Sequence, residues 1–351
     1  MTDDRGFGLE LEDDYAESVA KTDFDLDWWS EADTANFSMN GSPVTKRGSS
    51  RMNKRARAGV LKPSGSTEMD ADLQRIGHFF RGYLDNYVHT SPTSGSIHSH
   101  EFYGGEGKQL QSFRGITMKD FIKKYLFGLL IDTLKLEVSD DSLRVSTDWI
   151  YKTEKAGVIG ESSETFTRPD DLTDDLFIMF YDITVKLNNK NLLGDNGIVN
   201  SLSYEGKNNL AQDDSIGLGA RAPQAVAPAS DRDNKITISM NLTEGIVHDI
   251  LNAEYGEVNA LEMSSCKILE VPLEINIALC EYASQSMKIL FPKCTIKVTY
   301  EGNTTESIKV NLELDSLGSS SVTLLDGSTS VVTDMYVLLK NKQSEIAPKG
   351  A

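Results

Sequence analysis

Three histidines form the most metal-like group in the sequence. His98 and His100 are two residues apart, so an extended segment would point both imidazoles to one side, and His89 lies nearby in the chain. A metal site would also need a further ligand with a fixed orientation, and Glu101 faces the other side of such a segment. Polar residues in a solvated loop are therefore the favoured interpretation. We assign no catalytic, cofactor-binding or metal-ligating residue, and a metal-dependent enzyme is the least favoured alternative.

A block of basic residues is the second group that could do chemistry. No acid occurs between Val44 and Thr67. The block could bind phosphate, act as a localisation signal, or pair with acids on a neighbouring copy of the chain. Residues 51–57 contain no aromatic side chain that could stack on a base, which weakens recognition of single-stranded nucleic acid. The bases of the block are Lys46, Arg47, Arg51, Lys54, Arg55, Arg57 and Lys62.

An acidic segment precedes this block and favours pairing between copies. Residues 1–35 carry twelve acids against two bases, a net charge of −10, and such a segment buries too little apolar surface to fold alone. Trp28 and Trp29 lie near its end. We expect an arm that docks on a neighbouring copy, held by its aromatics and positioned by its charges. Its deletion should abolish assembly and leave a folded monomer.

The overall charge excludes several classes of function. The 351 residues include 53 acidic and 35 basic side chains, a net charge of −18, of which −15 remains outside the two charged blocks. A chain this acidic gains no counterion release on a nucleic-acid backbone, so we expect neither a general nucleic-acid binder nor a protein of anionic membranes. No uncharged apolar run approaches the 18 residues of a spanning helix.

The elements that position these groups are mostly strands. Alternating apolar residues run from Leu134 to Val138 and from Leu143 to Tyr151, around a turn at residues 139–142, which predicts a β-hairpin. Residues 89–118 lack a period and predict a long loop or a loose hairpin. A helix of about four turns begins near residue 72, because apolar residues recur there at helical spacing. They are Leu73, Ile76, Phe80, Tyr83, Leu84 and Tyr87.

The same order of elements occurs twice. A second amphipathic helix begins near residue 245 and is again followed by alternating strands. This predicts a mainly β chain, an antiparallel β-sandwich or barrel, built as two tandem, duplicated domains with one helix each. We place the domains at 36–170 and 171–342, between the acidic arm at 1–35 and a flexible tail at 343–351.

Residues 65–152 resemble the tail tube proteins of tailed bacteriophages, and a looser similarity covers 36–340. In that family a helix on a small β-sandwich is followed by a loop and by a hairpin whose strands help to line the tube. The acidic arm and the basic block do not match the family. The matching segments are Gly65–Leu73, His98–Phe102, Phe113–Thr117, Gly128–Val138 and Leu143–Trp149.

The resemblance implies a structural virion protein, not an enzyme, that needs no cofactor. Its copies would form stacked rings, either trimeric with pseudo-six-fold symmetry or hexameric, and would contact other tail proteins. Phage DNA would pass through the lumen during ejection without specific binding. The protein would be made in the host cytoplasm and reside in the virion tail, away from membranes. The alternative is another phage structural protein or a receptor-binding, β-rich virion protein.

We expect contacts between subunits from the two charged segments and from the hairpin after residue 133. The candidate residues are Trp28, Trp29, Arg51, Arg55, Arg57, Leu134, Leu136, Leu143, Val145 and Trp149.

Overall fold

A computed structural model shows a mainly β protein, as the alternating pattern predicted, and every strand pair among the described residues is antiparallel. Two helices, α1 (Gly77–Tyr83) and α2 (Glu244–Tyr255), and two short 3-10 turns, Phe180–Asp182 and Gln212–Ser215, accompany the strands. The structure describes residues 6–16, 27–29, 34–41, 43–47, 53–107, 109–119, 122–138, 141–158, 176–193, 197–256, 270–282, 284–301, 308–318 and 320–346.

The smaller sheet has the order β2-β1-β9-β10-β12 and uses only the first half of its longest strand, β10. Gly128 lies where β10 leaves this sheet, with φ +68 and a shift in register against β9. A Cβ there would come within 2.8 Å of the Tyr15 ring, so the bend requires glycine. The strands are β1 (Gly6–Leu11), β2 (Asp27–Trp29), β9 (Phe113–Lys119), β10 (Ile122–Val138) and β12 (Thr153–Val158).

The larger sheet continues from the second half of β10 and branches at another long strand, β18. Its main row is β3 (Thr34–Ser38), β6 (Ser64–Asp70), β11 (Leu143–Ile150), β10, β15 (Gly197–Lys207), β16 (Asp233–Leu242), β19 (Lys309–Ser316) and β18 (Ser286–Glu301). One branch contains β17 (Val271–Ala278), β13 (Ile183–Leu187) and β14 (Lys190–Asn191). The other contains β22 (Tyr336–Asn341), β8 (His98–Tyr103) and β7 (Asn86–Thr90).

The pairings among the described residues branch and do not return to their starting strand, so the barrel alternative is not realised. The two halves of the chain share this sheet, because β10 pairs with β15 and β8 pairs with β22. One large core cluster likewise takes buried side chains from both halves. The predicted boundary near residue 170 therefore falls between segments that share a sheet and a core.

The first helix is shorter than predicted. The periodicity predicted a helix over about 72–87, whereas α1 spans Gly77–Tyr83 and Tyr87 lies in strand β7. Two contacts fix the chain before the helix: Leu73 N donates to Leu176 O (3.0 Å), and Gln74 N donates to the Asp72 carboxylate (2.8 Å). Five of the six periodic apolar residues are still buried, because a turn and a short helix present the same face to the core. Residues 89–118, predicted as a long loop or a loose hairpin, contain the end of β7 and all of β8, which pair as a hairpin, and most of strand β9.

The start of the acidic arm belongs to the core of its own chain, which corrects the expectation that it docks on a neighbour. All six residues of β1 are buried, and β1 pairs with β9 along its whole length. Glu10 is neutralised by Arg114, whose Nε and Nη2 donate to its carboxylate at 2.8 and 2.9 Å. Trp28 and Trp29 lie in β2, which pairs with β1. Of the other residues of 1–35, residues 12–16 form a turn after β1, Asp27 belongs to β2, and residues 34 and 35 begin β3. The rest lie outside the described residues.

The predicted flexible tail is also corrected in part. Gln343 and Ile346 contact the body through hydrogen bonds, and Ile346 is only 2% exposed. Residues 347–351 lie outside the described part of the chain.

Candidate assembly interface

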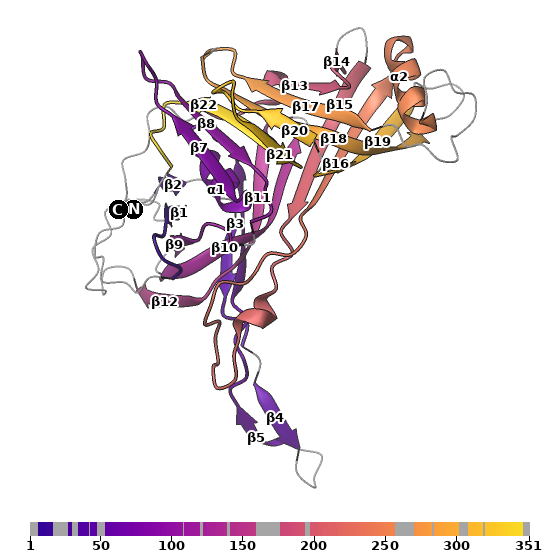
Figure 1. Cartoon of the computed structure of the whole chain (residues 1–351). Helices are drawn as coiled ribbons and strands as arrows, with labels where there is room; N and C mark the ends of the chain where they lie inside the picture. Colours follow the sequence, from indigo (N-terminus) through magenta and orange to yellow (C-terminus); the bar gives the residue numbers. More distant parts are fainter. Residues whose placement is uncertain are drawn as a thin grey trace.

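A basic hairpin projects from the body of the molecule (Figure 1). It consists of β4 (Val44–Arg47) and β5 (Asn53–Arg57), and among the described residues these two strands pair only with each other. Val44, Thr45, Ala56 and Arg57 are all exposed. An isolated two-stranded hairpin is at best marginally stable in water, so this element lacks the support that a core would give it.

The charge of the basic hairpin also opposes its own pairing. The register places Lys46 opposite Arg55, and Val44 opposite Arg57. Like charges at directly opposite positions destabilise a strand pair, and no acid lies in this stretch of sequence to offset them. A surface that carries negative charge would therefore stabilise the hairpin.

A long loop, residues 208–232, braces the root of the hairpin; we call it the brace loop. Leu61 N donates to Arg221 O at 2.7 Å, and Arg221 Nε donates to Gly59 O at 3.0 Å. The brace loop runs beside the chain that leads into the hairpin (Figure 1). Two hydrogen bonds to backbone carbonyl oxygens thus hold the root of the hairpin where it leaves the body.

Side chains add two further contacts at this root. Lys62 Nζ lies 2.6 Å from the Asp213 carboxylate, and Gln212 Nε2 donates to Pro63 O at 2.8 Å. Both partners of the ion pair are more than half exposed, so it contributes at most about 1 kcal/mol. The chief effect of this ion pair is to fix the direction in which the chain leaves the body toward the hairpin.

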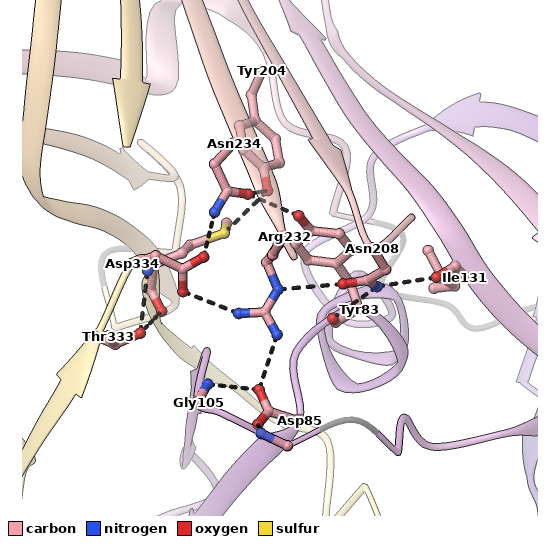
Figure 2. Close-up of polar contacts among 12 residues, drawn as sticks. Tyr83, Asp85, Gly105, Ile131, Tyr204, Asn208, Arg232, Asn234, Thr333 and Asp334 are labelled. Atoms are coloured by element: carbon pink, nitrogen blue, oxygen red, sulfur yellow. Dashed lines mark hydrogen bonds and ion pairs between the residues drawn. The ribbon is translucent and has the colours of Figure 1, made fainter. Parts of the chain in front are cut away.

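A buried polar cluster fixes the two ends of the brace loop (Figure 2). Arg232, at one end, donates from Nη2 to Asp85 and from Nη1 to Asp334, each at 3.0 Å. Asn208, at the other end, accepts from Arg232 Nε at 3.3 Å and donates to the carbonyls of Tyr83 and Ile131, both at 3.1 Å. The loop can therefore leave the body at a defined angle although it contains no sheet strand of its own.

The Arg232 cluster is electrostatically complete. Burial alone lowers the pKa of Arg232, but Asp334, Tyr83 and Asp85 outweigh it and leave this pKa raised. The Asp85 carboxylate also accepts the backbone N–H groups of Gly105 (2.7 Å) and Gly107 (2.9 Å). A polar cleft of about 750 Å³ opens beside it, lined among others by Asp231 and Asp334. Arg232 thus has a partner for each of its three donor nitrogens, Asp85, Asp334 and Asn208, so we assign the cluster a positioning role.

Exposed apolar residues accompany the basic hairpin and its brace. Val44 is 66% exposed and Val60 47% exposed, and Leu218 at the tip of the brace loop is fully exposed. Gly219 follows it with φ +87 in a turn, so the dinucleotide-like run from Gly217 lies in a loop tip without a helix after it. Apolar and basic groups on one projecting element are typical of a surface that another molecule covers.

Apart from Trp28 and Trp29, which lie in β2, the structure separates the predicted contact residues into two sets. The apolar five are buried within the single chain, none more than 3% exposed, so their side chains offer almost no surface to a neighbouring subunit. Their alternation reflects the core between β10 and β11. In the other set, Arg57 is exposed, Arg55 is described only as a backbone position of β5, and Arg51 lies outside the described residues. The buried five are Leu134, Leu136, Leu143, Val145 and Trp149.

The three histidines do come together, on β7 and β8. The ring centroids of His89 lie 5.2 Å from those of both His98 and His100. His89 Nε2 and His98 Nδ1 are 2.9 Å apart and share a hydrogen bond, which leaves no space for a metal between them. Within the described residues no group of three or more His, Cys, Asp or Glu has a geometry that could hold a metal ion.

The Arg232 cluster could not be found from the sequence. Asp85, Asn208, Arg232 and Asp334 are far apart in the chain, and none belongs to a recognisable motif. They lie outside the strands and come together only in the folded chain.

No protein-family model matches the chain, and no curated protein matches it either. Neither helix in the described part of the chain has the length and apolar character needed to cross a membrane.

Proposed function

We propose that this protein is a structural subunit of a bacteriophage tail tube, which assembles into stacked rings around a DNA conduit. The observation that carries the assembly part of the proposal is the basic hairpin, β4–β5, which stands away from the body and is built without a core. Contacts with neighbouring copies would stabilise such an element in an assembled protein. The resemblance of residues 65–152 to tail tube proteins names the kind of assembly.

The charge distribution supports contact between copies of one chain. The hairpin is basic, whereas the chain outside the two charged blocks carries a net charge of −15. Complementary charge gives orientation and speed to an encounter, and the exposed Val44, Val60 and Leu218 supply apolar area for it. An acidic wall would also let DNA slide through a lumen, because its phosphates would be repelled.

The repeated order of elements bears on the symmetry of the ring. Each half has one helix, followed by one long strand that changes partners midway, β10 in the first half and β18 in the second. We propose that the halves are duplicated tube domains, so that three copies supply six similar positions per ring. A ring of six copies is the alternative if the halves are not equivalent. Mass measurement of a solubilised ring separates the two.

Electron microscopy of the purified protein is the direct test. We expect rings or tubes that become less abundant as salt rises, because screening weakens contacts between exposed charges. A protein that stays monomeric at high concentration and low salt would contradict the proposal. A receptor-binding or decoration protein would instead occur in few copies per virion, which quantitative mass spectrometry of particles detects.

A charge-reversal pair makes the test specific to the basic hairpin. Arg55→Glu with Arg57→Glu should remove assembly while the monomer stays folded. The matched control is Lys235→Glu with Lys309→Glu, which makes the same change in net charge at exposed strand positions of the body. If the control blocks assembly as strongly as the hairpin variant, overall charge rather than the hairpin is responsible.

A further inference from the structure

The C-terminal segment lies across the face of the β7–β8 hairpin that carries the three histidines. We call residues 342–346 the C-terminal strap. Lys342 N donates to Gln74 Oε1 at 3.1 Å, which anchors the start of the strap beside α1. At its other end Ile346 is buried against Gly77, where an added Cβ would lie 2.5 Å from Ile346 Cδ1. Between these two anchors the strap is held by hydrogen bonds to β7 and β8.

One chain of hydrogen bonds joins the strap to His100, and it defines the protonation of that ring. Gln343 O can only accept, so His100 Nε2, 3.1 Å away, carries the proton. His100 Nδ1 is 2.9 Å from Tyr87 Oη, and the same Oη accepts Ile346 N–H at 2.9 Å. Tyr87 therefore donates its hydroxyl proton to a bare Nδ1. The whole chain is satisfied when His100 is neutral, and a second proton on the ring would remove the acceptor that Tyr87 uses.

The neighbouring rings make a second proton unfavourable as well. His89 lies between His98 and His100, with both centroids 5.2 Å away, and the 2.9 Å contact of His89 Nε2 with His98 Nδ1 has room for one proton. Protonated His89 and protonated His100 would repel each other at this distance.

Few charges from other elements face the stack. On the strap, Glu345 has its carboxylate 4.0 Å from His89 Nδ1. On α1, Arg81 lies over the Tyr87 ring at 5.2 Å, and His78 Nδ1 is 3.4 Å from Gln343 Nε2. One exposed carboxylate thus faces the Arg81 cation and the rings of His89 and His100, so acid would build up positive charge beneath the strap.

We propose that the C-terminal strap is a pH-operated latch, closed while His89 and His100 are neutral and released when acid protonates these two rings. Release uncovers the apolar site that Ile346 fills between Gly77, Phe102 and Leu339. The latch is independent of ring assembly and would operate in the monomer as well.

The pKa shifts agree with this geometry. Burial, with a smaller contribution from His89, lowers the pKa of His100 to about 4, and burial lowers that of His89 too. A histidine whose pKa is lowered in the closed form binds more protons in the open form. The closed form therefore has its full stability above about pH 6.5, the ordinary pKa of histidine, and loses it as pH falls toward 4.

Hydrogen exchange of the full-length protein, read by mass spectrometry at pH 7.5 and pH 5.0 with labelling times corrected for intrinsic rates, tests the latch. The reporters are the strap amides, Ile346 above all, and strand β16 is the reference. We expect protection of the strap to fall on the order of tenfold or more at pH 5.0 while β16 keeps its protection. Unchanged strap protection, or an equal loss in β16, would overturn the proposal.

A double substitution and a matched control sharpen the test. His89→Gln with His100→Gln removes the titration and retains polar side chains, so strap protection should no longer depend on pH. His248→Gln, an exposed histidine on α2, is the matched control and should behave as the unaltered protein does.

A substitution at an exposed residue of the strap tests the latch even if the double variant does not fold. Glu345→Gln removes the one carboxylate that favours protonated His89 in the closed form. Release should then occur at a pH higher by roughly half a unit, the size expected of one screened charge at this distance. An unchanged or lower midpoint would contradict the latch.

Discussion

The acidic arm and the basic hairpin are neighbours in the sequence, and both are strongly charged, yet the structure uses them in opposite ways. Strand β1 of the arm is buried along its full length, whereas the hairpin projects beyond the core (Figure 1). The difference follows from apolar alternation rather than from charge. Phe7, Leu9 and Leu11 alternate and fill one side of a sheet, while the hairpin strands offer only Val44 and Ala56.

Burying the arm required its charges to be neutralised inside the chain. Glu10 meets Arg114, and Glu12 accepts the backbone N–H groups of Ala16 (2.8 Å) and Gly128 (3.0 Å). The pKa of Glu12 is nevertheless raised, because burial outweighs these hydrogen bonds. Charge in a sequence therefore does not by itself place a segment outside a fold: an apolar strand can be buried with its charges if each charge finds an ion-pair or hydrogen-bond partner.

Deleting residues 1–16 should produce the largest contrast between the two segments. The loss of three buried apolar side chains, each worth about 1.5–3 kcal/mol, and of a buried ion pair approaches the whole stability of a typical domain, about 5–15 kcal/mol. We expect a chain without cooperative unfolding in circular dichroism. Replacing residues 44–57 by a short Gly-Ser turn should leave the melting temperature almost unchanged. A truncated chain that melts like the full one would contradict the assignment of β1 to the core.

Arg114→Met should have the next largest effect. It leaves the Glu10 carboxylate buried without its cation, which costs about 3–5 kcal/mol of unfolding free energy in chemical denaturation. Adding Glu10→Leu should restore most of the loss, because the pair is then replaced by apolar groups. The control is Lys297→Met, which removes an exposed pair with Glu313 and should change stability very little. Equal effects at the two sites would argue that the arm is not buried.

Lys62→Ala should have a small effect, at the root of the hairpin. The Lys62–Asp213 pair is exposed, so its removal should lower the unfolding free energy by no more than about 1 kcal/mol. Its effect should vanish at high salt, where such pairs are screened. A loss that persists at 1 M salt would mean that the pair is shielded from solvent and that the brace carries more of the fold than the structure indicates.

Arg57→Ala should have the smallest effect on stability, within about 0.5 kcal/mol, because its side chain is exposed on a hairpin without a core. Its effect on assembly is the informative quantity, measured by sedimentation. A large loss of monomer stability would show that the hairpin contributes to the fold and would remove the contrast with the arm.

The sequence predicted the strands well, but it did not predict whether their apolar faces pack in the core or against another subunit. Alternation from Leu134 to Val138 and from Leu143 to Tyr151 identified β10 and β11, since period two is a property of the backbone itself. The same residues were then assigned to a subunit interface, and the structure buries them in the core. An apolar face shows that something covers it, and one chain cannot show whether the cover is its own or a neighbour's.

Some features of the candidate site could likewise be predicted from the sequence, and others depend on the tertiary structure. The sequence alone determined that a basic block without acids lies between Val44 and Thr67, and that two histidines are spaced to lie on one side of a strand. That the basic block forms a projecting hairpin came from the structure. Only the tertiary structure decided that the acidic arm is buried, that Arg232 fixes the brace loop, and that the strap closes over His100. Local patterns arise from backbone geometry within a few residues. These other features depend on contacts between residues 100 or more positions apart, whose energies no local window of sequence contains.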